Sequence, residues 1–192
     1  MKDLDVRGMA CPLPVVSVKR ALEEGEGALR VLLDDGTPRE NVRRFAEGRG
    51  LQVLEEPAEG GYALTLSGGG APASAGAAGP AGPVVMLFSS DRLGDGPEEL
   101  GRLLMKNFIM TLTELSEPPD RMLFINTGVH LTTDGSEVLE ALGALANRGA
   151  EILSCGICLD FFHKKDKLAA GQVTNLFTAA ESMLKAGSFI RV

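Results

Sequence analysis

Several features that place a chain in a membrane or on nucleic acid are missing from this sequence. Its 192 residues contain no unbroken apolar run near the ~18 residues that a membrane span requires. Residues 1–5 are polar and lead directly into a structured pattern, so we predict no secretory signal. The formal net charge is −7, and no block of Lys or Arg offsets it. Because nucleic-acid affinity rests largely on neutralising phosphates, we expect neither a nucleic-acid nor a membrane partner.

Cysteine is also scarce, with three residues in the chain. Without an export signal, these read as thiols in a reducing compartment and not as a disulfide framework, so we expect a cytoplasmic protein. Cys155 and Cys158 are close enough in sequence to pair with each other, which leaves Cys11 alone.

The first of these cysteines lies in the stretch Gly-Met-Ala-Cys-Pro-Leu-Pro, residues 8–14. An alternating strand pattern precedes it and an amphipathic helical pattern follows it. Pro12 and Pro14 fit the first turn of a helix, where a missing N–H costs nothing. Cys11 is therefore expected at or next to the N-cap, where unpaired amides and the positive end of the helix dipole favour a thiolate. The competing interpretation is a small buried cysteine that only packs.

The pattern of apolar residues predicts two α/β domains joined by a linker. Residues 1–66 read as β-α-β-α-β-β, a two-layer α/β unit. Residues 67–83 are rich in Gly, Ala and Pro and are typical of a flexible linker. From residue 84 to residue 192 strands and helices alternate, which predicts an open, mostly parallel α/β domain.

Within the second domain the pattern predicts a strand at 84–88, a helix at 97–115 and a strand at 122–125. A further helix at 136–147, a strand ending at Cys155, a last helix capped by Thr174 and a final strand follow. The side chains expected to face inward from the first of these helices are Leu100, Leu103, Leu104, Phe108, Leu112 and Leu115.

The carboxyl ends of the strands carry the second candidate site, because ligands of open α/β sheets bind there. Residues 89–91, residues 126–128 and Cys155 should meet at this edge, with His130 beside them. Cys155 and Cys158 form a CxxC motif that opens toward a helical segment, so either thiol is expected to have a lowered pKa.

Four interpretations of the CxxC motif remain open. One cysteine holds a persulfide while the other resolves or protects it, or the two form a dithiol redox couple. Alternatively, the two cysteines bind a metal together with His163, although one CxxC and one histidine make a weak zinc signal. In the last interpretation both thiols are inert. His130 is either a hydrogen-bonding loop residue or a functional group at the rim.

The first 66 residues resemble the TusA/SirA family of small sulfur carriers, whose signature is Cys-Pro-x-Pro at the start of the first helix. Residues 11–14 match that signature. Residues 84–192 resemble a DsrE-like domain. Asn-Thr-Gly-Val at 126–129, Leu-Thr at 131–132 and Ser-Cys-Gly-Ile-Cys-Leu-Asp at 154–160 are similar to segments of YedF-type proteins linked to selenium metabolism.

The resemblance implies a sulfur or selenium carrier resembling a sulfurtransferase, with a persulfide or its selenium counterpart on Cys11. It implies transfer to or from Cys155, with Cys158 as an additional thiol, and needs no cofactor. Pro12, Pro14, Asn126 and His130 are expected as supporting residues. The implied partners are a donor protein and an acceptor protein, with self-association through the DsrE-like domain. The alternatives are a non-catalytic regulatory or small-ligand-binding protein and a dithiol oxidoreductase.

Overall fold

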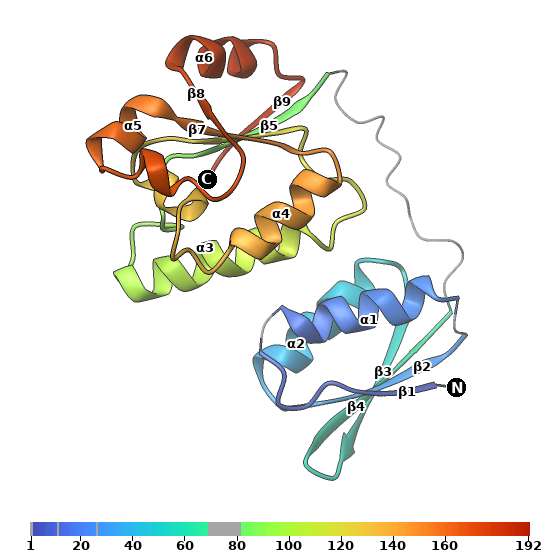
Figure 1. The fold of residues 1–192 in the computed structure, drawn as a ribbon. Coiled ribbons are helices and arrows are strands. Elements are labelled where there is room, and N and C mark those ends of the chain that lie inside the picture. The colour runs from blue at the N-terminus through green and yellow to red at the C-terminus, as the bar shows by residue number, and fades with distance from the viewer. Residues whose placement is uncertain (1, 11, 26, 69–81) are drawn as a thin grey trace. The chain divides into compact units, whose positions relative to one another are not determined.

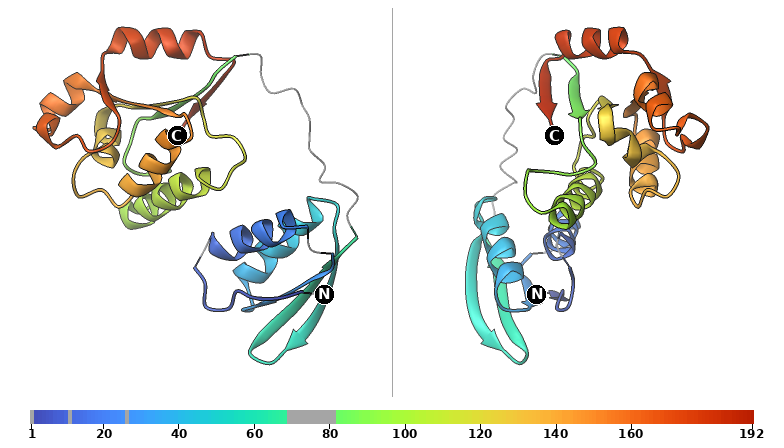
Figure 2. Two further views of the ribbon diagram at one scale, coloured as in Figure 1. Left: turned by 45° about the vertical axis from the view of Figure 1, so that its right-hand side comes forward. Right: turned by 90° about the vertical axis from the view of Figure 1, so that its left-hand side faces the viewer.

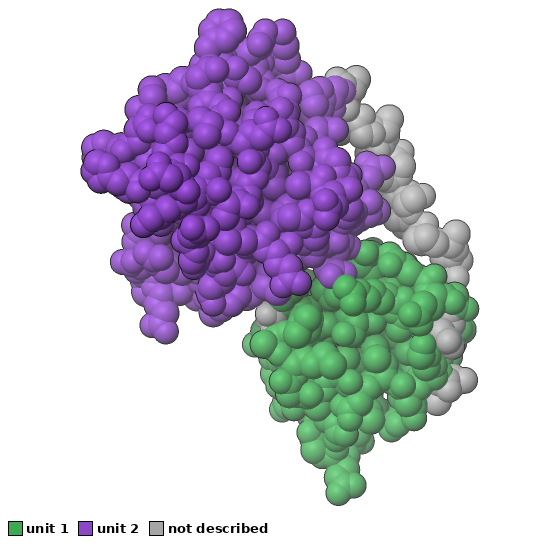
Figure 3. All heavy atoms as spheres, viewed as in Figure 1, with its two compact units in different colours: residues 1–77 green, residues 78–192 purple. Residues whose placement is uncertain are grey.

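The chain forms two compact units, residues 1–77 and residues 78–192 (Figure 3). The computed structural model describes residues 2–10, 12–25, 27–68 and 82–192. Residues 69–81, most of the predicted linker, therefore lie outside the described residues, as does Cys11.

The N-terminal unit has the predicted β-α-β-α-β-β order. Its elements are β1 (Lys2–Asp5), α1 (Leu13–Glu23), β2 (Leu29–Leu33), α2 (Thr37–Glu47), β3 (Gln52–Ala58) and β4 (Gly61–Ser67). The strands form one sheet in the order β1-β2-β4-β3, in which β1 and β2 are parallel and the other pairs antiparallel. Both helices cover the same face of this sheet (Figure 1), so the unit has the two layers that the sequence predicts.

The core of the N-terminal unit lies between the helices and the sheet. Leu29, Val31 and Leu33 alternate along β2 and are fully buried. They pack in one cluster with Val18 of α1 and Val42 of α2. Burying each such side chain stabilises the fold by roughly 1.5–3 kcal/mol, and this cluster holds α1 against the sheet.

The C-terminal unit is a parallel α/β domain, as predicted. Its elements are β5 (Val84–Phe88), α3 (Glu98–Leu112), β6 (Arg121–Phe124), η1 (Asn126–Thr132), α4 (Leu139–Asn147), β7 (Glu151–Cys155), α5 (Gly156–Phe161), η2 (Lys165–Lys167), β8 (Gln172–Thr174), α6 (Leu176–Leu184) and β9 (Ser188–Arg191). The strand order is β8-β7-β6-β5-β9, and every pairing between these described strands is parallel.

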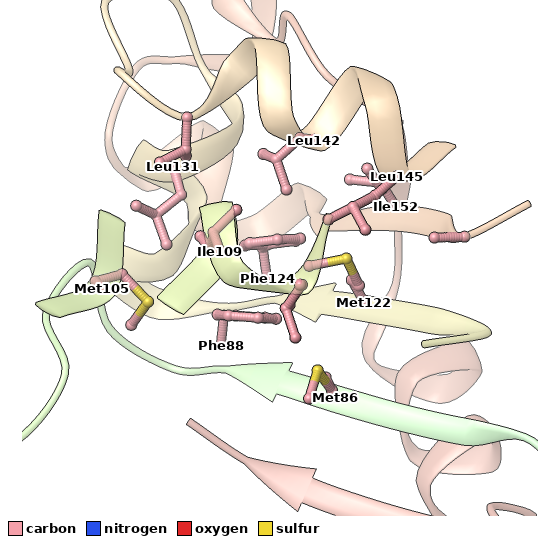
Figure 4. Packing of buried hydrophobic residues seen from close by; sticks show 13 residues of the cluster. Met86, Phe88, Met105, Ile109, Met122, Phe124, Leu131, Leu142, Leu145 and Ile152 are labelled. Carbon is pink, nitrogen blue, oxygen red and sulfur yellow. The ribbon is translucent and has the colours of Figure 1, made fainter. Parts of the chain in front are cut away.

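Helices cover both faces of this sheet, with α3 and α4 on one side and α6 on the other (Figure 1, Figure 2). The larger cluster lies beneath α3 and α4 (Figure 4), where the rings of Phe88 and Phe124 stack with centroids 4.7 Å apart. Among the described residues, no helix has both the length and the apolar character needed to cross a bilayer.

The predicted inner face of α3 is partly wrong. Leu112 is buried and Phe108 is half-buried, but four other leucines expected inside are exposed: Leu100, Leu103, Leu104 and Leu115. The buried side of the helix instead carries Gly101, Met105 and Ile109. Gly101 lies close to the chain after β5 on this side: a Cβ atom there would be 3.0 Å from the Cβ of Arg92, and its carbonyl accepts the Leu93 N–H at 3.0 Å.

The segment after α5 also differs from the prediction. Residues 172–174 form the edge strand β8, which the sequence analysis missed because three residues are too few to show an alternating apolar pattern. Thr174, the predicted helix cap, is the last residue of that strand. The helix α6 is instead capped by Asn175, whose Oδ1 accepts the Thr178 N–H at 2.9 Å.

Candidate functional site

The first candidate site lies where the chain enters α1. The helix begins at Leu13, with Pro12 as its N-cap residue and Pro14 buried in its first turn. Cys11 directly precedes this cap in the sequence but lies outside the described residues, so its geometry stays a prediction.

The amides at the start of α1 are already bonded. The Leu13 N–H donates to the Ala10 carbonyl at 2.9 Å, and the Val15 and Val16 amides donate to the Pro12 carbonyl at 3.1 Å and 3.2 Å. The two prolines have no N–H to offer. The prediction of unpaired first-turn amides is therefore wrong for these described donors. The helix dipole remains as a source of positive potential at this end.

The loop before the cysteine is anchored by contacts that the sequence analysis missed. The Gly8 N–H donates to Asp34 Oδ2 at 2.6 Å, and Gly8 has a φ of +72°. The Arg7 guanidinium bonds the carboxylate of Asp5 and the carbonyl of Glu59. These long-range contacts join the loop to the end of β2 and to the β3–β4 turn.

The second candidate site is the pair of thiols at the end of β7. Cys155 is the last residue of that strand and the N-cap residue of α5, and it is 2% exposed. Cys158 lies in the first turn of α5 and is half-buried. Both are free thiols, and Cys155 lies close enough to Cys158 to influence its ionisation. Cys158 is thus the more accessible of the two.

The environment of Cys158 acts against ionisation. Burial raises the pKa of its thiol, and the neighbouring Cys155 thiol raises it further. The backbone N–H of Asn126 donates to the Cys158 Sγ atom at 3.1 Å and opposes this by lowering the pKa. The net direction is upward, so the expectation of a lowered pKa is wrong for Cys158.

The carboxyl ends of β5, β6 and β7 come together as the sequence analysis expected. The Ile125 N–H donates to the Phe88 carbonyl at 3.0 Å, and the Asp91 N–H donates to Thr127 Oγ1 at 3.4 Å. A Cβ atom at Gly128 would collide with the Phe88 carbonyl oxygen, so only glycine permits this approach. The turn after β6 is therefore packed firmly against the end of β5.

His130 lies at the other end of η1 from Asn126. Its ring contacts that of Phe162, with centroids 4.6 Å apart, and it lines a pocket of about 410 Å³ whose described lining includes neither cysteine. Among the described residues no three His, Cys, Asp or Glu side chains come together to hold a metal ion, so His163 does not join the two thiols.

Comparison with known proteins identifies the N-terminal unit. The family model described as sulfurtransferase TusA matches residues 2–67. The proposed sulfur carrier protein MJ0990 of Methanocaldococcus jannaschii is 44% identical over 69 residues, which cover 34% of this chain and 92% of that protein. A crystal structure of a SirA-like protein from Desulfitobacterium hafniense is 38% identical, with a TM-score of 0.33, and covers 36% of this chain and all of that one.

A second solved structure is similar at low identity. The crystal structure of the YchN protein from E. coli has a TM-score of 0.45 and 13% identity, and the match covers 57% of this chain and 99% of that one. The TusA family model lies within the N-terminal unit. Through that unit, the chain belongs to the family of the sulfurtransferase TusA.

Proposed function

We propose that this protein is a two-unit sulfur relay, in which a persulfide on Cys11 exchanges with the thiols of a DsrE-like unit of the YedF type. The observation that carries the proposal is the 44% identity of the N-terminal unit to a proposed sulfur carrier. The cysteine that directly precedes the proline-capped helix α1 is the thiol that such a carrier would use.

In the first step the Cys11 thiolate attacks the terminal sulfur of a donor persulfide. One S–S bond breaks in the donor and one forms on Cys11, and the donor leaves as a thiolate, so no net oxidation occurs. A selenium atom in place of the terminal sulfur would follow the same route.

In the second step Cys158 is the entry thiol of the C-terminal unit, because it is half-buried whereas Cys155 is 2% exposed. The Cys158 thiolate takes the terminal sulfur from Cys11 and releases the Cys11 thiolate. Cys155 then attacks Cys158 Sγ, which forms the disulfide and releases hydrosulfide. A dithiol reductant must afterwards return the pair to thiols, unless an acceptor thiolate takes the sulfur first.

Mass spectrometry of the intact chain tests this route. The protein is incubated with a persulfide donor, and the added sulfur is mapped to individual cysteines in Cys11→Ser, Cys155→Ser and Cys158→Ser variants. We expect Cys11→Ser to lose loading at both sites and Cys158→Ser to keep loading on Cys11 alone. Loading of Cys11→Ser at the wild-type rate would contradict the relay. A parallel incubation with a selenium donor distinguishes the two elements.

A second candidate function is a dithiol oxidoreductase, which the placement of Cys155 at the N-cap and Cys158 in the first turn of α5 favours. It predicts reduction of insulin disulfides that requires both residues and is independent of Cys11. The relay predicts no such activity in the Cys11→Ser variant.

A further inference from the structure

A pocket of about 410 Å³ lies beyond the carboxyl ends of β5 and β6. Its walls come from the loop after β5, from α3, from the C-terminal half of η1, from residues 134–138 between η1 and α4, and from the chain after α5. Leu131 and Val138 supply apolar surface, while the remaining walls are dominated by charged and polar side chains. The proposed relay uses none of these walls.

The protonation of His130 follows from its burial. Its Nδ1 atom is buried and has no hydrogen-bond partner among the described residues. A buried N–H without an acceptor costs about 1–3 kcal/mol, so the proton of the neutral ring belongs on Nε2. His130 lines the pocket, and Nε2–H is then its remaining ring donor.

Lys164 adds a positive charge that no described carboxylate neutralises. Its Nζ atom donates to the Thr133 hydroxyl at 3.2 Å, and no ion pair is formed with it among the described residues. Its backbone is fixed by a hydrogen bond from its N–H to the Leu159 carbonyl at 2.8 Å. The ammonium group is therefore held at the pocket by a neutral partner.

Most of the other charges around the pocket are paired. Asp91 is 3.2 Å from Arg102, and Glu137 is 3.0 Å from Lys106. Asp134, an exposed carboxylate, lines the pocket as well. The corner between His130 and Lys164 therefore holds the lining cation that forms no ion pair among the described residues, and Asp134 is the lining carboxylate in the same condition.

The surroundings of His130 keep its ring neutral. Burial lowers its pKa, the Lys164 and Arg102 cations lower it further, and Asp91 opposes them.

We propose that this corner binds a small oxyanion, held by the Lys164 ammonium and by His130 Nε2–H. The binding site is separate from the thiols and needs neither of them. Tetrahedral oxyanions of sulfur and of phosphorus share this chemistry, because both offer several acceptor oxygens to converging donors.

Nuclear magnetic resonance of the His130 ring tests the proposal. The chain has two histidines, and His163→Gln, an exposed position outside the pocket, leaves His130 as the single signal. Sodium thiosulfate and inorganic phosphate are titrated separately, with sodium chloride at the same ionic strength as the control. We expect a saturable shift and a rise in the His130 pKa of about half a unit or more, because a bound anion stabilises the imidazolium. The anion with the lower dissociation constant shows whether the site prefers a sulfur oxyanion or a phosphorus oxyanion.

Two neighbouring lysines give a matched pair. Lys164→Gln should weaken binding by about tenfold or more, as expected for the loss of a charge-assisted hydrogen bond, and Lys164→Arg should retain part of it. Lys165→Gln should bind as the parent does, because Lys165 pairs with Asp160 at 3.2 Å and does not line the pocket. The same response in a Cys155→Ser/Cys158→Ser variant separates this site from the relay. A shift equal to that in chloride, or one unchanged by Lys164→Gln, overturns the proposal.

Discussion

The backbone N–H of Asn126 donates a hydrogen bond to the Sγ atom of Cys158 over 3.1 Å, across 32 positions of sequence. Asn126 has a φ of +51°, a left-handed conformation that asparagine tolerates better than most residues. The turn after β6 therefore aims an amide at the more accessible thiol of the CxxC pair.

Substitutions at Asn126 should change the reactivity of Cys158 through the backbone. Asn126→Gly keeps the conformation and should leave the pKa of Cys158 unchanged. Asn126→Val opposes a left-handed φ at a cost of about 1–2 kcal/mol, which should displace the amide and raise the pKa. The pH profile of iodoacetamide alkylation, measured on Cys158 by peptide mapping in a Cys11→Ser background, checks this. Equal profiles for both variants would show that the amide has no influence.

Removal of the partner thiol should make Cys158 more acidic. The neighbouring Cys155 thiol raises the pKa of Cys158, so Cys155→Ala should lower that pKa. Burial continues to raise it, so the value should remain above that of an ordinary thiol. Each unit of decrease gives about tenfold more thiolate at neutral pH. Alkylation of Cys11→Ser/Cys155→Ala, which has a single cysteine, measures it directly; an unchanged or higher pKa would contradict the contact.

A methyl group at Gly128 should destabilise the C-terminal unit. The new Cβ would collide with the Phe88 carbonyl oxygen at the junction of β5 and η1, and overpacking of this kind costs about 1–3 kcal/mol. Gly143 in α4 is the matched control, because a Cβ there meets no atom within 4 Å. Gly143→Ala should stabilise the unit by about 0.5–1 kcal/mol. Urea unfolding followed by far-UV circular dichroism should show opposite shifts of the midpoint.

The N-terminal unit should lose stability in acid through Asp5. Hydrogen bonds from Arg7 lower its pKa from 3.8 to about 2. A lowered carboxyl pKa contributes stability that is present above pH 3.8 and is lost as the pH falls toward about 2. Asp5→Asn should flatten the stability profile in that window. The chain has one tyrosine, Tyr62 in β4, and no tryptophan, so tyrosine fluorescence reports this unit separately. If Asp5→Asn left the slope of stability against pH unchanged, the result would contradict the contact between Asp5 and Arg7.

The rotation of α3 can be tested with two substitutions. Leu103 is 54% exposed whereas Ile109 is fully buried. Leu103→Ser should change the free energy of unfolding of the C-terminal unit by less than about 0.5 kcal/mol, and Ile109→Ala should lower it by about 2–5 kcal/mol. A larger loss of unfolding free energy for Leu103→Ser would mean that Leu103 is on the inner face of α3, as expected from the sequence.

The sequence by itself determined the order of elements in the N-terminal unit and the parallel character of the C-terminal sheet. Those features follow from local periodicity, as in the alternation of Leu29, Val31 and Leu33 and the continuous apolar run of 84–88. The sequence also placed Cys155 and Asn126 at the same sheet edge, because parallel strands end together.

The tertiary structure decided which residues of each apolar pattern are buried. The sequence of α3 offers two apolar faces, and the fold buries the one that carries Gly101, Met105 and Ile109. Only the fold shows that Cys158 is more exposed than Cys155 and that its pKa is raised. The hydrogen bonds of the amides at the start of α1 likewise depend on the local backbone geometry. The periodicity of a sequence shows which residues are apolar. Burial and hydrogen bonding depend on which atoms pack beside those residues in the folded chain.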